Sequence, residues 1–440
     1  MPAATLSLPL ISGYRPDAIL IWQRGTGVSQ AQFLGAAATL AVRLPASATH
    51  ILPLAESRAA FMVAFAAGLL SGRPCLLPST GSSTAVEALR LAHPAAIVLS
   101  DTAAHCTAAG DLLMNTAFDD AVWVEATAPQ IPAAQLAAIV HTSGSTGTPK
   151  AEPKSWAALV ATAERASARF FKGVNIVATV PPQHMFGLEA SVMLALAAGC
   201  TVDAVRPFFP ADVAAALASL PAPRLLVTTP VHLRALVAAG VQLPKLGMVL
   251  SATAPLAIEL AERVETLFHA PLYEIYGCTE AGSLATRRTT RDADWRLYPD
   301  LRLEADEDGT LLHASYLPGP VRLSDDIELL DAEHFRLLGR SSEMLKVAGK
   351  RIALGEITQA LLAIPGVEDG VVFAPEVGAA IERPAALVVA PGLSVAQVLA
   401  ALSLKLDAVF LPRPLKLVAK LPRNAVGKIS RAALLEALNG

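Results

Sequence analysis

The segment with the clearest chemical character is TSGSTGTPK (142–150), which follows the apolar run AAIV (137–140). Its glycines lack a Cβ, so backbone N–H groups and the hydroxyls of its serines and threonines can converge on an anion. Lys150 adds a positive charge at its end. The chain contains no G-x4-G-K-[ST] Walker A loop and no G-x-S-x-G nucleophile elbow. The pattern predicts a phosphate-binding loop that follows a buried strand.

Three other segments place reactive side chains beside glycine or proline. They are PPQHMFGLEA (181–190), YGCTE (276–280) and LPRNAVGKISR (421–431). The Glu280 carboxylate is the kind of ligand that Mg²⁺ prefers. Lys428 offers a positive charge ahead of a terminal helical stretch, and the His184 imidazole can exchange a proton near neutral pH.

These segments must be positioned by the elements around them. Short apolar runs alternate with helical periodicity over the first 250 residues, which predicts parallel sheets covered on both faces. We expect strands at 51–55, 74–78, 95–100, 121–125, 175–180, 224–229 and 247–252, and helices at 31–44 and 85–93. A polar, turn-rich stretch (285–317) predicts a small β-rich subdomain. The last hundred residues predict a compact α/β unit, with helices at 354–366 and 395–410 and strands at 367–374, 384–390 and 414–420.

Composition narrows the class of protein. The chain has 440 residues, 53% of them hydrophobic, and a net charge of -3, so it offers no broad basic surface for nucleic acid. Its apolar run at 59–70 is shorter than the roughly 20 residues of a membrane-spanning helix, and we expect a buried core helix there. The four cysteines and nine histidines show no metal-ligand spacing. With no basic stretch ahead of an apolar core at the N-terminus, a cytoplasmic enzyme with reduced thiols is expected.

TSGSTGTPK closely resembles the phosphate loop of the adenylate-forming superfamily, which comprises acyl-CoA synthetases, adenylation domains and luciferases. The resemblance continues in order along nearly the whole chain. Its further segments are SATAPL (251–256), YGCTE (276–280), SDD (324–326), LGRSSEMLKVAGKRIALGEI (338–357) and LPRNAVGKISR (421–431). Several motifs in the same order are far more specific than any one of them.

The resemblance implies a set of site residues. ATP or AMP would be bound by Thr142, Ser143, Gly144, Ser145, Thr146, Gly147, Lys150, Thr253, Ala254, Pro255, Tyr276, Gly277, Thr279, Asp326, Arg340 and Arg351. Within this set, Tyr276 would lie near adenine and Asp326 would accept the ribose hydroxyls. Lys428, His184 and Glu280 would be catalytic, with Glu280 also the Mg²⁺ ligand.

The resemblance also implies the architecture, an α/β fold in two domains. The large N-terminal domain (1–340) would contain parallel αβαβα-type sheets and the β-rich subdomain. A small, mobile α/β lid (341–440) would rotate about Ser342, where the family pattern usually has Asp or Lys. Asp325 is a second departure, since a glycine usually precedes the ribose aspartate.

The function implied is that of an AMP-forming acid–thiol ligase. A small carboxylic acid would attack the α-phosphorus of ATP, and the acyl group would pass to coenzyme A or to the phosphopantetheine of an acyl carrier protein. The segment around His184 has no acid before Glu189, which favours an aryl or medium-chain acid over an amino acid. Two alternatives remain: a catalytically silent acyl- or nucleotide-binding protein, and a nicotinamide dehydrogenase suggested by RGTGVSQ (24–30), which lacks the third glycine of the dinucleotide fingerprint.

Overall fold

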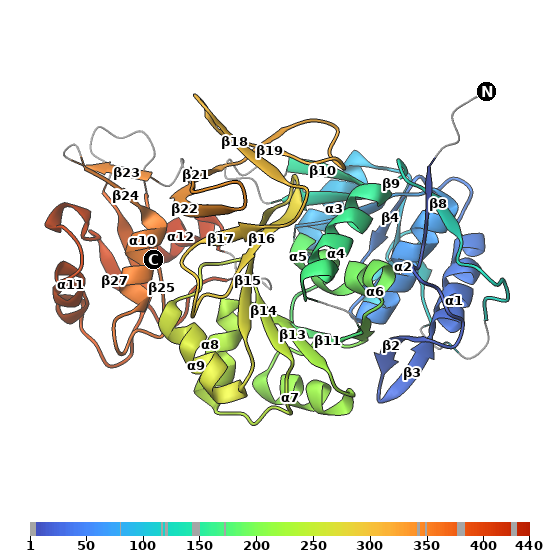
Figure 1. Ribbon diagram of the computed structural model, residues 1–440, viewed down its shortest axis with the longest axis horizontal. Coiled ribbons are helices and arrows are strands. Elements are labelled where there is room, and N and C mark those ends of the chain that lie inside the picture. Colours follow the sequence, from blue (N-terminus) through green and yellow to red (C-terminus); the bar gives the residue numbers. More distant parts are fainter. Residues whose placement is uncertain are drawn as a thin grey trace.

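The chain folds into two α/β regions and a smaller C-terminal unit, as the computed structural model shows (Figure 1). The structure describes residues 6–79, 81–115, 118, 122–142, 150–170, 173–340, 344–347, 350–375, 383–423 and 429–440. Among them, none of the helices combines the length and apolar character needed to cross a membrane.

The first region is built on a six-stranded sheet of order β10-β9-β5-β4-β6-β7. Its strands are β4 (His50–Pro53), β5 (Cys75–Leu77), β6 (Ala96–Ser100), β7 (Leu112–Leu113), β9 (Leu136–Thr142) and β10 (Lys150–Ser155). All its pairings are parallel except that of β10 with β9. The helices of this region are α1 (Gln30–Arg43), α2 (Arg58–Ser71) and α3 (Ser83–Ala92). A separate two-stranded ribbon pairs β1 (Ser7–Pro9) with β8 (Gln130–Pro132).

Helix α2 shows how local sequence produces this packing. Ser57 caps its first turn by accepting a hydrogen bond from the Ala60 N–H, and Gly72 ends it in the left-handed conformation that glycine adopts without strain. All residues from Arg58 to Leu69 are buried, so the apolar run at 59–70 is a core helix, as predicted.

The second region is built on an eleven-stranded sheet of order β21-β22-β17-β16-β15-β14-β13-β11-β12-β2-β3. Its strands are β2 (Ile19–Gln23), β3 (Thr26–Ser29), β11 (Asn175–Ala178), β12 (Thr201–Asp203), β13 (Arg224–Thr228), β14 (Met248–Ser251), β15 (Leu272–Cys278), β16 (Gly282–Arg287), β17 (Trp295–Leu297), β21 (Asp325–Leu329) and β22 (His334–Arg340). The centre, from β2 to β15, is parallel, and both ends are antiparallel.

Helices cover both faces of this sheet. On one face lie α7 (Pro210–Ser219), α8 (Pro230–Ala239) and α9 (Ile258–Phe268), gathered below the sheet in Figure 1. The other face carries α4 (Trp156–Phe170) and a segment that winds from α5 (Met185–Gly187) through a π-helical stretch (Leu188–Met193) into α6 (Leu194–Ala198). The main hydrophobic core joins this face to the six-stranded sheet.

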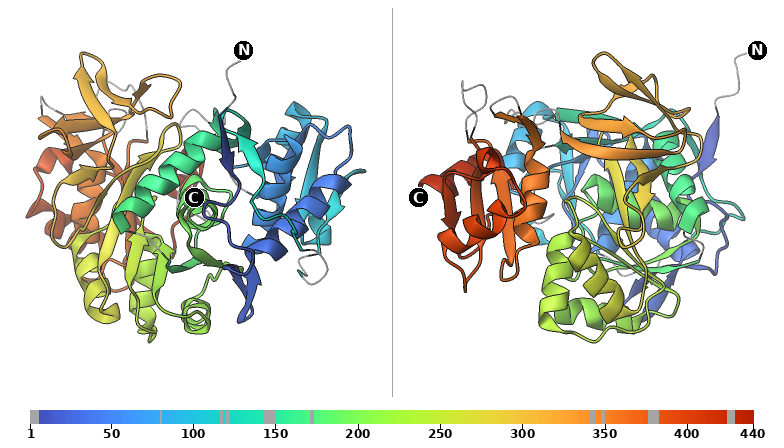
Figure 2. Two further views of the ribbon diagram at one scale, coloured as in Figure 1. Left: turned by 45° about the vertical axis from the view of Figure 1, so that its right-hand side comes forward. Right: turned by 60° about the vertical axis from the view of Figure 1, so that its left-hand side comes forward.

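The C-terminal residues form their own cores, lying to one side of the rest of the chain (Figure 2). Their elements are β23 (Met344–Val347), β24 (Lys350–Ala353), α10 (Leu354–Leu362), β25 (Asp369–Phe373), β26 (Ala385–Val389), α11 (Val395–Ser403), β27 (Leu415–Leu417) and α12 (Arg431–Asn439). Asp369 nevertheless pairs with Arg234 of α8 at 3.1 Å, which ties the unit to the large region.

The structure corrects three expectations. The large sheets are mixed, because the chain adds antiparallel hairpins at their edges. Residues 122–125 form no strand, although Trp123 is anchored there by its N–H to Ala31 O. The turn-rich stretch 285–317 is divided: β16 and β17 extend the large sheet, and only β18 (Arg302–Asp306) and β19 (Gly309–His313) form a small sheet with β20 (Val321–Arg322).

Candidate functional site

Two of the segments predicted to bind nucleotide lie at the carboxyl ends of neighbouring parallel strands. Thr253, Ala254 and Pro255 follow β14, and Thr279 with Glu280 follows β15. In open α/β sheets, ligands bind at this edge. Thr253 has a φ of 80°, which is uncommon for a residue other than glycine and concentrates at functional sites.

The β9–β10 hairpin frames the predicted phosphate loop. Thr142 at the end of β9 lies opposite Lys150 at the start of β10. The intervening candidates, Ser143, Gly144, Ser145, Thr146 and Gly147, lie outside the described residues. The hairpin therefore fixes where this loop leaves and rejoins the sheet.

Lys150 connects this hairpin to the turn after β15. Its Nζ lies 2.6 Å from Glu152 Oε1 and 3.3 Å from Glu280 Oε1, a residue 130 positions away. The hydrogen bond to Glu152 is the main reason that the pKa of Lys150 is raised. Partial burial alone would raise the pKa of Glu280, but its own backbone N–H and Lys150 outweigh burial and lower it. Glu280 is therefore held as a carboxylate.

Glu280 fits the role of a Mg²⁺ ligand. Proteins usually hold Mg²⁺ through one or two carboxylates together with substrate phosphates. The Glu280 carboxylate is half-buried, ionised and adjacent to the Lys150 ammonium, at the edge of the predicted phosphate loop. The donor set thus combines one hard anionic ligand with a cation suited to the phosphates.

Tyr276 and Gly277 lie near the end of β15, just before the turn that carries Thr279 and Glu280. The Tyr276 ring is only 8% exposed and packs against Trp295 and Phe335, and its hydroxyl donates to Asp325 Oδ2 at 2.8 Å. Asp325, the departure from the usual glycine, thereby has a partner. A Cβ on Gly277 would lie 2.4 Å from Gly282 O, so only glycine permits this close pairing of β15 with β16.

His184 stands at the entry to the α5 segment. Its Nδ1 accepts a hydrogen bond from the Phe186 N–H at 3.3 Å. An accepting Nδ1 assigns the ring proton to Nε2 in the neutral imidazole. The neutral, half-buried ring therefore carries its N–H at Nε2.

The remaining predicted residues are placed only in part. Asp326 is half-buried on β21, opposite Gly339, and Arg340 lies opposite Asp325 in the same ladder. Arg351 lies on β24. The side chains of both arginines, and all of Ser342 and Lys428, lie outside the described residues.

Sequence reasoning missed two buried charged residues beside this turn. Lys154 on β10 is 4% exposed, and its Nζ donates to Glu280 O at 2.5 Å. Glu189 is 6% exposed and accepts from the Ser283 backbone N–H at 3.1 Å and from its hydroxyl at 2.5 Å. Burial lowers the pKa of Lys154 and raises that of Glu189. The available signal was β10 itself, KAEPKS, which has charged residues where a strand beside a buried neighbour normally has apolar ones.

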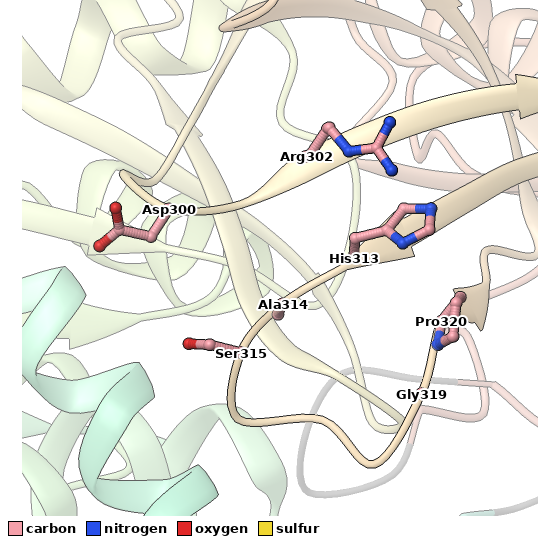
Figure 3. Close-up of a pocket in the computed structure, with 7 residues that line it drawn as sticks. All are labelled: Asp300, Arg302, His313, Ala314, Ser315, Gly319 and Pro320. Atoms are coloured by element: carbon pink, nitrogen blue, oxygen red, sulfur yellow. The ribbon is translucent and has the colours of Figure 1, made fainter.

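The described part of the chain contains a cavity beside Glu189 and another on the small β18–β19 sheet. A small one of about 10 Å³, room for roughly one water molecule, is lined by Glu189, Ser283, Thr162 and Ile275. A larger open pocket of about 290 Å³ lies on the small β18–β19 sheet, where Arg302 and His313 project side by side (Figure 3). None of the residues predicted to bind ATP or the acid lines the larger pocket.

Comparison with known proteins decides the family. The profile of the AMP-binding enzyme family matches residues 29–303. The chain belongs to the AMP-binding enzyme family. This confirms the resemblance to the adenylate-forming superfamily drawn from the motifs. The RGTGVSQ segment, by contrast, forms the turn and the second strand of the antiparallel β2–β3 hairpin and ends at the first residue of α1. It is therefore not a glycine turn between a parallel strand and a helix, which removes the basis for a nicotinamide dehydrogenase.

Individual relatives match part of this chain. The chain is 34% identical over 241 residues to the 4-coumarate–CoA ligase of Rhodobacter capsulatus, covering 52% of this chain and 59% of that protein. It is 29% identical to the 4-coumarate–CoA ligase of Halorhodospira halophila over 66% of this chain and 73% of that protein. The fold matches that of the Bacillus subtilis o-succinylbenzoate CoA synthetase, solved with its acyl-adenylate intermediate. The TM-score is 0.82 at 18% identity, covering 98% of each chain.

Proposed function

We propose that this AMP-binding enzyme is an AMP-forming acid–thiol ligase that activates a carboxylic acid with ATP and passes the acyl group to a thiol. The observation that carries the proposal is the contact between Lys150 and Glu280. It joins the predicted phosphate loop to the predicted Mg²⁺ ligand, two segments far apart in sequence, at the ligand-binding edge of the sheet.

The first half-reaction requires two anions to meet. The phosphate loop (142–150) would cradle the phosphates, Thr279 would donate its hydroxyl to the α-phosphate, and Asp326 would accept the ribose hydroxyls. A magnesium ion on Glu280 would neutralise charge on the departing pyrophosphate. Lys428 would bridge the carboxylate and the α-phosphate, so that attack occurs in line and the developing charge is stabilised.

The acid is proposed to be an aryl acid. The relatives named above include two 4-coumarate–CoA ligases, whose substrate is an aryl acid. His184 would place its Nε2–H beside the acyl group, at the start of the α5 segment. The acid-binding side offers no carboxylate from 185 to 188 to pair with an α-ammonium group, which disfavours an amino acid.

The second half-reaction is proposed to need the lid. Residues 341–440 would rotate about Ser342, withdrawing Lys428 and admitting the thiol. The separate cores of the C-terminal unit support such a division near residue 340. Coenzyme A is the acceptor that the relatives' names favour, with a carrier-protein phosphopantetheine as the alternative.

The experiment that tests the proposal separates the half-reactions. Wild type should release pyrophosphate from ATP with members of a panel of aryl acids. Lys428→Ala should lower that rate by a factor on the order of 10²–10³, because one preorganised electrostatic donor is lost. Transfer from a synthetic acyl-AMP to coenzyme A should fall much less. Lys420→Ala, on an exposed lysine nearby in sequence, is the matched control.

Two outcomes would contradict the proposal. Absence of pyrophosphate release with every acid would leave a silent binding protein. Equal loss of both half-reactions in Lys428→Ala would make Lys428 a structural residue.

A further inference from the structure

We propose that Lys154 and Glu189 are positioning residues that brace the 280–283 turn from two sides and thereby aim the Glu280 carboxylate at the metal. The inference rests on the proposed function, since it assigns Glu280 the metal. It adds two residues that touch neither nucleotide nor acid in the proposed mechanism.

Lys154 braces the turn from the phosphate-loop hairpin. It lies four residues after Lys150 on β10, and its ammonium donates to the backbone carbonyl of Glu280, not to its carboxylate. A charge-assisted hydrogen bond to a carbonyl in a buried setting resists displacement. The Glu280 side chain is left to reach Lys150 at 3.3 Å. One strand therefore holds the backbone of Glu280 through Lys154 and its carboxylate through Lys150.

Glu189 braces the turn from the segment that begins at His184. Its Oε2 takes both the N–H and the hydroxyl of Ser283, three residues beyond Glu280. A Cβ on Gly282 would lie 2.3 Å from Glu189 Oε1, so the turn has a glycine where the carboxylate presses against it. Gly282 also has a φ of 83°, which favours glycine.

A third contact completes the support. The Tyr316 hydroxyl donates to Ala281 O at 2.9 Å. Residues 280, 281 and 283 are thus held by a lysine, a tyrosine and a glutamate that come from three separate segments of the chain. Residues of a site must be held within about 0.5 Å of the productive geometry, and buried polar contacts of this kind supply that precision.

The contacts of Lys154 and Glu189 also link three segments of the proposed site. The strand β10 carries Lys150, the segment 184–189 carries His184, and the turn after β15 carries Thr279 and Glu280. Lys154 and Glu189 bind the first two segments to the third. Disturbing either side chain should therefore move the Glu280 carboxylate without removing it.

The test measures how much Mg²⁺ improves ATP binding, as the ratio of the ATP dissociation constants in EDTA and in Mg²⁺, by calorimetry. Lys154→Met keeps the length of the side chain and removes its donor. If Lys154 acted only through its charge, removing a cation would strengthen metal binding. If it positions Glu280, the ratio should fall by about tenfold, the loss of one hydrogen bond to a charged group. The direction of the change separates the two roles.

Companion variants keep the test independent of folding. Lys154→Met/Glu189→Gln removes both charges together, so that no buried charge is left without its counterpart. The single change Glu189→Gln leaves an amide oxygen for Ser283, so it should lower the ratio by no more than about threefold, while Glu189→Leu should match Lys154→Met. Lys416→Met is the control, because Lys416 also donates to a carbonyl, that of Leu438 at 3.3 Å, far from the turn.

The outcomes are distinct. A wild type that releases no pyrophosphate with any acid would defeat the proposed function. An active wild type whose folded Lys154→Met and double variants keep the wild-type ratio, or exceed it, would overturn the brace. Equal weakening of ATP binding with and without Mg²⁺ would also overturn it, because that result indicates a general structural role.

Discussion

Two buried cations, Arg58 and Lys154, show how differently the same kind of side chain is used in the core and at the site. Arg58 is fully buried and donates to Ser191 Oγ and to the carbonyls of Ala178, Val180 and Val205, at 2.7–3.1 Å. Among the described residues, the Lys154 ammonium has one hydrogen-bond acceptor, the Glu280 carbonyl. Nearby, Glu189 Oε1 has no hydrogen-bond partner within the described part of the chain.

The difference in hydrogen bonding distinguishes a buried cation that stabilises the core from one that positions a single turn. A buried polar network that is fully satisfied rigidifies the core, whereas an incompletely satisfied one carries a cost that must be offset elsewhere. Arg58 joins α2, the π-helical segment and the end of β11, so its hydrogen bonds hold the two large sheets together. Lys154 and Glu189 hold a single turn. The first cation should therefore govern stability, and the second should govern the geometry of the site.

The largest expected effect comes from Arg58→Met. It leaves the Ala178 and Val180 carbonyls buried without their donor, and we expect the free energy of unfolding to fall by about 3–5 kcal/mol. Urea denaturation followed by tryptophan fluorescence measures this. Arg73→Met is the matched control: Arg73 is half-buried and donates to the Ala48 and Pro45 carbonyls, so about 1 kcal/mol should be lost. Similar losses of unfolding free energy in the two variants would mean that full burial does not make the hydrogen bonds of Arg58 more important for stability than those of Arg73.

The sequence predicted the main helices, strands and motifs, but it did not predict the contrast between the buried cations Arg58 and Lys154. Apolar periodicity predicted α1, α2, β4 and β11 because the buried faces of these elements consist of apolar residues. The phosphate-loop and YGCTE motifs predicted the residues that meet at Lys150 and Glu280. Lys154 belongs to no such motif, and the charged residues of β10 alone do not show which of its lysines is buried. Its burial involves the β15–β16 turn, more than a hundred residues away, where its ammonium meets the Glu280 carbonyl.

The antiparallel edges of the large sheet were missed for a related reason. Local propensity identifies a strand but not the direction of its partner, which depends on the connection. Residues 285–297 look like an independent hairpin because they are polar and turn-rich. They join the sheet because Trp295 and Leu297 are buried on it, with Arg169 of α4 donating to Leu297 O.

The second prediction concerns stability and tests Asp203, whose charge interacts with that of Arg58. Burial raises the pKa of Asp203 to about 6, although the Val205 N–H and Arg58 both lower it. The unfolded value is about 3.9, so the native state binds the extra proton between these two values and stability falls as pH rises through that window. The loss is complete near pH 7 and is on the order of 3 kcal/mol, two units at about 1.4 kcal/mol each.

Asp203→Asn isolates this contribution. The new amide keeps an oxygen acceptor for the Val205 N–H, which lies 2.8 Å from Asp203 Oδ1 in the wild type, but it does not titrate. The stability of wild type relative to the variant should therefore drop by about 3 kcal/mol from pH 4 to pH 7 in urea titrations. Parallel pH profiles would mean that Asp203 ionises as easily in the folded chain as in the unfolded one.

The smallest effect is expected at the turn itself, where Gly282→Ala tests whether Glu189 presses against the backbone. Gly282 and Gly240 share a left-handed conformation, with φ of 83° and 61°, so alanine strains both backbones by about 1 kcal/mol. Only at Gly282 does the new methyl group meet other atoms, Glu189 Oε1 at 2.3 Å and Thr162 Cγ2 at 2.9 Å; around Gly240 the space is open. Because the carboxylate must then move, Gly282→Ala should lose about 1–2 kcal/mol more than Gly240→Ala in urea denaturation. If the two variants lose the same amount, the Glu189 carboxylate moves aside without cost and does not press against the turn.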